Sequence, residues 1–139
     1  MGMVYENITI KNATDVGVLE RGNIKEGEVR QIKVLALIDT GAWTLIINEE
    51  MQQELGLYVM GERPVTLADS GTQMCKVTEP VYIHWKDRSA VTRAAVLPGL
   101  DEVLLGAIPL EEMDVMVDPK RQQLVGVHGD EMLFKIYSC

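Results

Sequence analysis

The stretch that decides the fold reads Ile32-Lys33-Val34-Leu35-Ala36-Leu37-Ile38-Asp39-Thr40-Gly41-Ala42. Its apolar part, interrupted only by Lys33, predicts a buried β-strand that stops abruptly at a small acidic turn. A carboxylate at the end of a buried strand is costly unless it is hydrogen-bonded, paired or used in chemistry. Gly41 permits a tight turn and the close approach of another chain, and the Thr40 hydroxyl can fix the turn. A second apolar run, Leu45-Ile46-Ile47, follows the turn.

The composition is that of an ordinary globular protein. A chain of 139 residues, 47% hydrophobic and 24% charged, predicts a single domain over residues 1–139. The formal net charge of −8 and the lack of a basic cluster argue against nucleic acid and against an anionic membrane surface. No apolar stretch approaches the roughly 18–20 residues that cross a bilayer, and the N-terminus lacks a signal-peptide pattern. We therefore expect a cytoplasmic protein.

Cysteines and histidines do not form a recognisable site. Cys75 and Cys139 are too few for a disulfide framework, so we expect two free thiols. His84 and His128 are far apart, and no Cys/His spacing is typical of zinc. No glycine-rich phosphate loop is present. The sequence predicts neither a metal nor a cofactor.

The rest of the chain reads as many short strands between turn signals. A short helix is expected after Asn48 as N-cap, with Gly56 as C-cap, and another at 108–113. Residues 12–15 read as a turn, 16–28 as an ambiguous surface connection that could carry a short helix, and 58–64 as a loop. The expected strands are 3–11, 28–38, 64–68, 72–77, 81–85, 90–97, 103–106, 114–117 and 122–127, with 132–137 as a candidate last strand. This pattern predicts a mostly β barrel or sandwich with one or two short helices.

A second apolar run, Val103-Leu104-Leu105-Gly106, precedes a short helical segment. Alone it would be an ordinary core strand. Together with the early Asp39-Thr40-Gly41-Ala42 and a hairpin between them, it resembles the order of elements in the retropepsin-like (retroviral-type) aspartic proteases. The resemblance covers residues 29–127, preceded by an N-terminal strand and connection at 1–28, and is closest to the cellular, bacterial-type members.

The resemblance implies an all-β, closed β-barrel of the acid protease fold, with one lobe per chain. It implies that Asp39 is the catalytic carboxylate, that the Thr40 hydroxyl bonds across to a partner loop, that Gly41 lets two loops approach, and that Ala42 completes the loop. The strand carrying Leu104, Leu105 and Gly106 would cross behind this loop. Trp43 departs from the small or polar residue that many relatives carry, which leaves substrate preference open.

The turn Asp69-Ser70-Gly71 is similar to Asp39-Thr40-Gly41 and could be a second copy of the motif. The chain is too short for a second lobe, so we interpret Ala68, Asp69, Ser70 and Gly71 as the tip of a flap that closes over a bound peptide. Since the chemistry needs two carboxyls, the second Asp39 must come from an identical chain in a two-fold dimer. Residues 3–10 and 132–137 are candidates for pairing across that interface.

The first hypothesis is a homodimeric aspartic endopeptidase that hydrolyses a peptide or protein substrate with an Asp39-activated water. The alternative is a catalytically inactive retropepsin-like module that binds an extended peptide as an added strand. A third reading is a β-barrel in which Asp-Thr-Gly occurs by chance.

Overall fold

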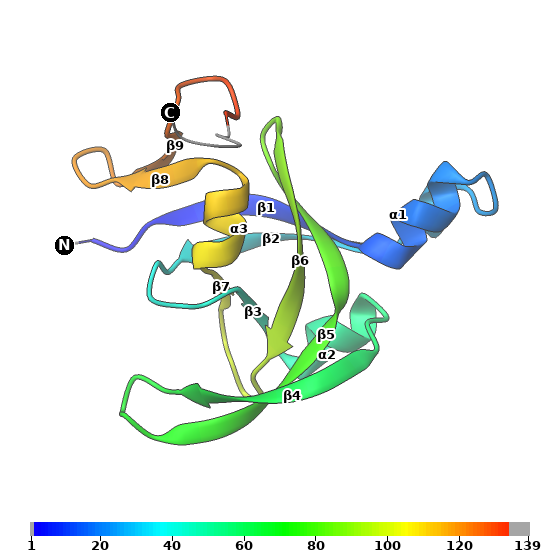
Figure 1. Ribbon diagram of the computed structural model, residues 1–139, viewed down its shortest axis with the longest axis horizontal. Helices are drawn as coiled ribbons and strands as arrows, with labels where there is room; N and C mark the ends of the chain where they lie inside the picture. Colours follow the sequence, from blue (N-terminus) through cyan, green and yellow to red (C-terminus); the bar gives the residue numbers. More distant parts are fainter. Residues whose placement is uncertain (1, 134–139) are drawn as a thin grey trace, which may run out of the picture.

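Six strands close into a barrel. The computed structural model describes residues 2–133, and Figure 1 shows the strands wrapping around a common interior. The order around the barrel is β1 (Tyr5–Asn12), β2 (Gln31–Ile38), β7 (Val103–Leu105), β3 (Leu45–Ile47), β6 (Arg88–Val96) and β5 (Thr72–Trp85), which returns to β1. The predicted all-β closed barrel is confirmed.

Strand β1 closes the barrel because it pairs on both edges. It runs antiparallel to β2, where Ile10 lies opposite Ile32, and antiparallel to β5, where Ile10 lies opposite Ile83. The β5 pairing involves residues 9–12 of β1, so the first half of the strand has no second strand beside it among residues 2–133. Of the segment 3–10 proposed for pairing across a dimer, residues 9 and 10 are thus already paired on both edges within the chain.

The interior is filled by aliphatic side chains from alternate positions of the strands. The sequence has few aromatic residues, so branched side chains supply the volume. The largest fully buried apolar side chains are Ile10, Leu45, Ile47, Leu55, Ile83, Leu105, Met113, Val81 and Val96. They come from both ends of the sequence, which explains why the barrel needs most of the chain to close.

Strand β4 (Val59–Thr66) pairs with β5 and projects beyond the barrel as a hairpin (Figure 1). The sequence predicted a loop at 58–64, which is wrong. Pro64 is tolerated because no other strand pairs with the outer edge of β4 within the described residues.

The two strands expected at 72–77 and 81–85 are one long strand, β5. It bends at a bulge between Val77 and Pro80, where the register to β6 shifts. The Thr78 hydroxyl accepts a hydrogen bond from Ala94 N (3.2 Å), and the Glu79 carboxylate accepts one from Tyr58 N (3.0 Å). These side chains satisfy polar groups at the bend, so one strand serves both the barrel and the hairpin.

Three short α-helices are present in the described residues, α1 (Ala13–Glu20), α2 (Glu49–Glu54) and α3 (Ala107–Glu112), with a 3-10 turn at Glu26–Glu28. Helix α2 begins as predicted, because the Asn48 side chain accepts a hydrogen bond from Met51 N (2.9 Å). Helix α1 covers residues where the sequence predicted a turn at 12–15 followed by an ambiguous connection that could carry a short helix. Asn12 caps it by accepting from Asp15 N, and the Asp15 carboxylate binds the Arg30 guanidinium through two oxygens, both at 2.8 Å.

A second small sheet follows the barrel. Strands β8 (Val115–Asp118) and β9 (Gln123–Gly126) form a hairpin near the strands predicted at 114–117 and 122–127. Met132 and Leu133 are not in a strand, and the remainder of the candidate strand at 132–137 lies outside the described residues, as does Cys139. Nowhere in residues 2–133 is a helix both long and apolar enough to cross a membrane.

Candidate active site

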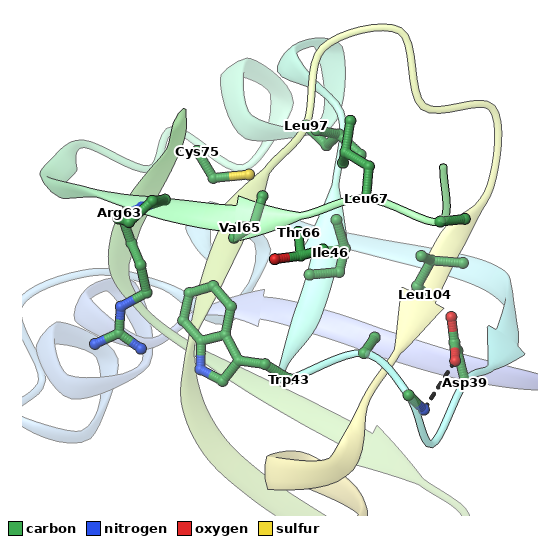
Figure 2. Close-up of a pocket in the computed structure, with 14 residues that line it drawn as sticks. Asp39, Trp43, Ile46, Arg63, Val65, Thr66, Leu67, Cys75, Leu97 and Leu104 are labelled. Atoms are coloured by element: carbon green, nitrogen blue, oxygen red, sulfur yellow. Dashed lines mark hydrogen bonds between the residues drawn. The ribbon is translucent and has the colours of Figure 1, made fainter. Parts of the chain in front are cut away.

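Asp39 lies directly after β2, at the first position of a tight loop. Its backbone N–H donates to Leu105 O (3.0 Å), and its carbonyl accepts from Ala42 N (3.0 Å). Gly41 N donates to the Asp39 Oδ1 atom (2.9 Å). These three hydrogen bonds orient a half-buried carboxylate at the mouth of a cavity (Figure 2).

Strand β7 supports this loop from behind. It runs parallel to β2, with Ile38 opposite Leu105, and antiparallel to β3, with Leu45 also opposite Leu105. It therefore lies between the two strands that the loop connects. The loop is also bound to the start of α3, because Ala107 N donates to Ala42 O (2.8 Å).

Gly106 stands at the most crowded point of this junction. A Cβ atom at Gly106 would lie 2.5 Å from both Ala42 O and Thr44 O. Both are backbone atoms, so no side-chain rotation can relieve the contact. The glycine is required by space, since its φ of −97° suits any residue.

A cavity of about 720 Å³ lies between the Asp39 loop and the β4–β5 hairpin. Its size falls in the range typical of sites for small molecules or short peptide segments. Among the residues proposed from the sequence, Asp39, Gly41, Ala42, Ala68 and Leu104 line it. Leu105 is in the barrel core instead, and Gly106 is buried behind the loop.

The hairpin tip is a tight turn at the edge of this cavity. Leu67 N donates to Gly71 O (2.8 Å), and Ser70 N donates to Leu67 O (2.9 Å). Ser70 adopts a positive φ of 68°, which is uncommon for a residue with a side chain. The Asp69 carboxylate accepts from Gly71 N (2.9 Å). Asp69, Ser70 and Gly71 do not line the cavity, unlike Ala68.

Sequence reasoning missed much of the cavity wall. The consecutive residues 63–68, from β4 into the hairpin tip, line the cavity, and Cys75 on β5 lies opposite Arg63. Burial raises the pKa of the Cys75 thiol. Leu97 completes the apolar wall at the end of β6. Arg63 stands directly before the strand predicted at 64–68, and it would have been assigned to that strand had β4 been recognised from its start.

Trp43 and Arg63 meet across the cavity. The Arg63 guanidinium lies over the Trp43 ring, 4.7 Å from its centroid, and Figure 2 shows the pair at the end away from Asp39. Such stacking is worth about 0.5–1 kcal/mol at an exposed site. It links the loop that carries Asp39 to the base of the hairpin.

Thr40 is exposed at the tip of the Asp39 loop, and its hydroxyl makes no hydrogen bond to any residue in 2–133. The described residues that line the cavity include a single carboxylate, Asp39. Across the part of the chain that the structure describes, no group of three or more His, Cys, Asp or Glu side chains is arranged to hold a metal ion.

Comparison with known proteins bears on the fold. No protein-family model matches the chain, and no curated protein is significantly similar to it in sequence. Among solved structures, the crystal structure of a retropepsin-like aspartic protease from Rickettsia conorii is similar with a TM-score of 0.54 and 20% sequence identity, over 85% of this chain and 78% of that one. The chain therefore has a retropepsin-like fold.

Proposed function

We propose that the protein is an aspartic endopeptidase that hydrolyses peptide bonds with a water activated by Asp39. The observation that carries the proposal is the position of Asp39, which lies in a braced loop at one end of a groove large enough for a peptide segment. A hairpin covers the groove and could close over a bound peptide. The fold shared with a retropepsin-like protease supports the same reading.

The chemistry needs two carboxyl groups that share one proton. One carboxylate accepts a proton from the attacking water, while the other, protonated, polarises the scissile carbonyl. A lone Asp39 in the cavity cannot fill both roles. In the proposal each chain is one lobe, and a second copy related by a two-fold axis supplies the other Asp39.

Several features favour a dimer at the face that carries Asp39. In Figure 1 the start of β1, the loop between β2 and β3 and the tip of the β4–β5 hairpin all lie on the left side of the molecule. Met3, two residues before β1, is 69% exposed. The Thr40 hydroxyl, which bonds to none of the described residues, would be available to the partner's loop, and Gly41 would allow the two backbones to approach.

The test is cleavage of a peptide library from acid to neutral pH by the wild type and by Asp39→Asn. We expect the variant to lose cleavage while its circular dichroism and thermal unfolding stay close to those of the wild type, because the amide oxygen of an asparagine at this position can still accept from Gly41 N. Full activity in Asp39→Asn would contradict the assignment. Sedimentation at working concentration checks the dimer, and an active strict monomer would contradict it.

The alternative function is a peptide-binding module without catalysis. The outer edge of β4 pairs with no other strand of the described chain, so it can accept an added strand. Peptide retention by the folded wild type without cleavage at any pH would favour this module over the enzyme.

A further inference from the structure

The Arg63 side chain is an unused cation in the cavity. Of the described residues that line this cavity, Arg63 carries the only positive charge and Asp39 the only negative one. The Arg63 guanidinium makes no hydrogen bond or salt bridge to any residue in 2–133, and its observed partner is the face of Trp43 at 4.7 Å. Its N–H donors therefore remain available to a ligand.

Stacking on Trp43 holds the guanidinium without consuming its donors. A guanidinium over an aromatic face keeps its planar edge free, and this edge matches a carboxylate with two parallel hydrogen bonds. The neighbouring acid Glu62 does not compete, because it points to the other face of β4 and lies in register with Lys76. The surroundings of Arg63 inside the cavity are the apolar Val65 and the neutral Cys75 thiol.

Arg63 lies far enough along the cavity from Asp39 to contact a substrate residue outside the cleaved bond. Figure 2 shows Asp39 and Arg63 at opposite ends of the cavity, with Ile46, Val65 and Leu97 between them. An extended peptide advances about 3.3 Å per residue. A peptide whose scissile carbonyl lies at Asp39 would thus place an outer residue, and not the residues at the cleaved bond, beside Arg63.

We propose that Arg63, oriented by Trp43, selects substrates with an acidic side chain at an outer position of the groove. This inference rests on the proposed endopeptidase function. It also draws on the proposed two-fold symmetry, because a groove shared by two chains carries one Arg63 toward each end. The preference for Glu or Asp therefore occurs at equal distances on both sides of the cleaved bond.

The experiment uses pairs of peptide pools that share an apolar centre and random flanks. In each pair one pool has Glu and the other Gln at a single flanking position, and each flanking position is tested in turn. We expect the wild type to cleave the Glu pool about tenfold faster at the selected position, the size of one charge-assisted hydrogen-bond pair. Arg63→Gln should abolish this ratio, and Arg63→Glu should invert it, so that the Gln pool is cleaved faster than the Glu pool. Arg21→Gln removes one positive charge next to α1, at the far end of the molecule from the hairpin tip, and should retain the ratio.

The ratio of the Glu-pool and Gln-pool cleavage rates distinguishes recognition of an acidic side chain from a purely structural role of the Trp43–Arg63 contact. If the contact only fastened the hairpin, Arg63→Gln would slow cleavage of both pools equally, and that result would overturn the inference. Equal cleavage of the Glu and Gln pools by the wild type would overturn it as well.

Failure of the endopeptidase proposal can be distinguished from failure of the Arg63 proposal. If the wild type cleaves neither pool, the endopeptidase function fails, and the pools are passed over immobilised wild-type and Arg63→Gln protein. Glu peptides enriched only on the wild type, identified by mass spectrometry, would support Arg63 as an acid-selecting site. Equal retention of Glu and Gln peptides would refute it.

Discussion

Substitution of Gly106 by alanine tests whether β7 and α3 hold the Asp39 loop in place. The added Cβ atom would lie 2.5 Å from Ala42 O and Thr44 O, whereas ordinary contacts begin at 3.4 Å, so about 0.9 Å of separation must be gained from each. Backbone has to move, since neither contact involves a side chain. The move would strain the hydrogen bonds from Ala107 N to Ala42 O and from Ile108 N to Trp43 O.

The expected cost follows from these contacts. Inserting a methyl group into a packed site costs about 1–3 kcal/mol, and each weakened hydrogen bond adds about 0.5–1.5 kcal/mol. With two such bonds, we therefore expect Gly106→Ala to lose roughly 2–6 kcal/mol of unfolding free energy. For a domain of this size the midpoint of thermal unfolding should fall by about 8–24 °C. The rate of peptide cleavage should fall by more than the loss of folded protein explains, because the same backbone shift displaces Asp39.

Calorimetry or circular dichroism at one fixed chain concentration measures the midpoint, since the proposed dimer would make it depend on concentration. Gly27→Ala is the matched control, because nothing lies within 4 Å of a Cβ atom there and its φ is not positive. It should leave stability within about 1 kcal/mol of the wild type. A Gly106→Ala protein that unfolds within about 3 °C of this control and cleaves peptides normally would refute the reasoning.

Three further predictions concern titratable groups. The Arg30 guanidinium holds the pKa of Asp15 below its ordinary value, so the pair stabilises the fold above the unfolded-state pKa of about 3.9 and loses that effect as pH falls through the folded pKa. Asp15→Asn should therefore lower stability at pH 7 by roughly 1–3 kcal/mol but much less at pH 2, as measured by urea unfolding. The hydrogen bond from His128 lowers the pKa of Asp114, so an NMR titration of His128→Asn should show the Asp114 pKa rising toward its usual range. Cys75 is 2% exposed, and burial raises the pKa of its thiol. Iodoacetamide should therefore modify it at least about tenfold more slowly in the folded protein than in urea, as measured by peptide mass mapping. Equal rates would contradict its burial.

Local patterns were sufficient where neighbouring residues decide the structure. The apolar run before Asp39 became β2, and Asn48 caps the start of α2 as expected, since a cap depends on residues within one helical turn. The C-cap of α2 is Leu55 and not Gly56, which follows it with a positive φ of 63°. The apolar run ending at Gly106 became β7. Its location behind the Asp39 loop was expected from the resemblance to retropepsin-like proteases and not from its own sequence.

Other elements depend on partners distant in the chain. Helix α1 follows from the Asp15–Arg30 ion pair and the Asn12 cap, which the turn-like sequence at 12–15 did not reveal. At the bend in β5, Ala94 N donates to the Thr78 hydroxyl and Tyr58 N donates to the Glu79 carboxylate. The strand therefore continues through the register shift between Val77 and Pro80. A sequence pattern shows the break at Pro80 but not the groups that compensate for it.

The sequence by itself determined the chemistry that is available: a carboxylate after a buried strand, a loop of small residues around it, and a core of branched aliphatic side chains. The tertiary structure alone decided the walls of the site. Closure of the barrel through β1 and β5, and the bend that carries the hairpin over the loop, bring Arg63 and Cys75 into the cavity with Trp43. The physical reason is that a strand's side chains alternate by local geometry, whereas the surface that each face meets is set by long-range pairing.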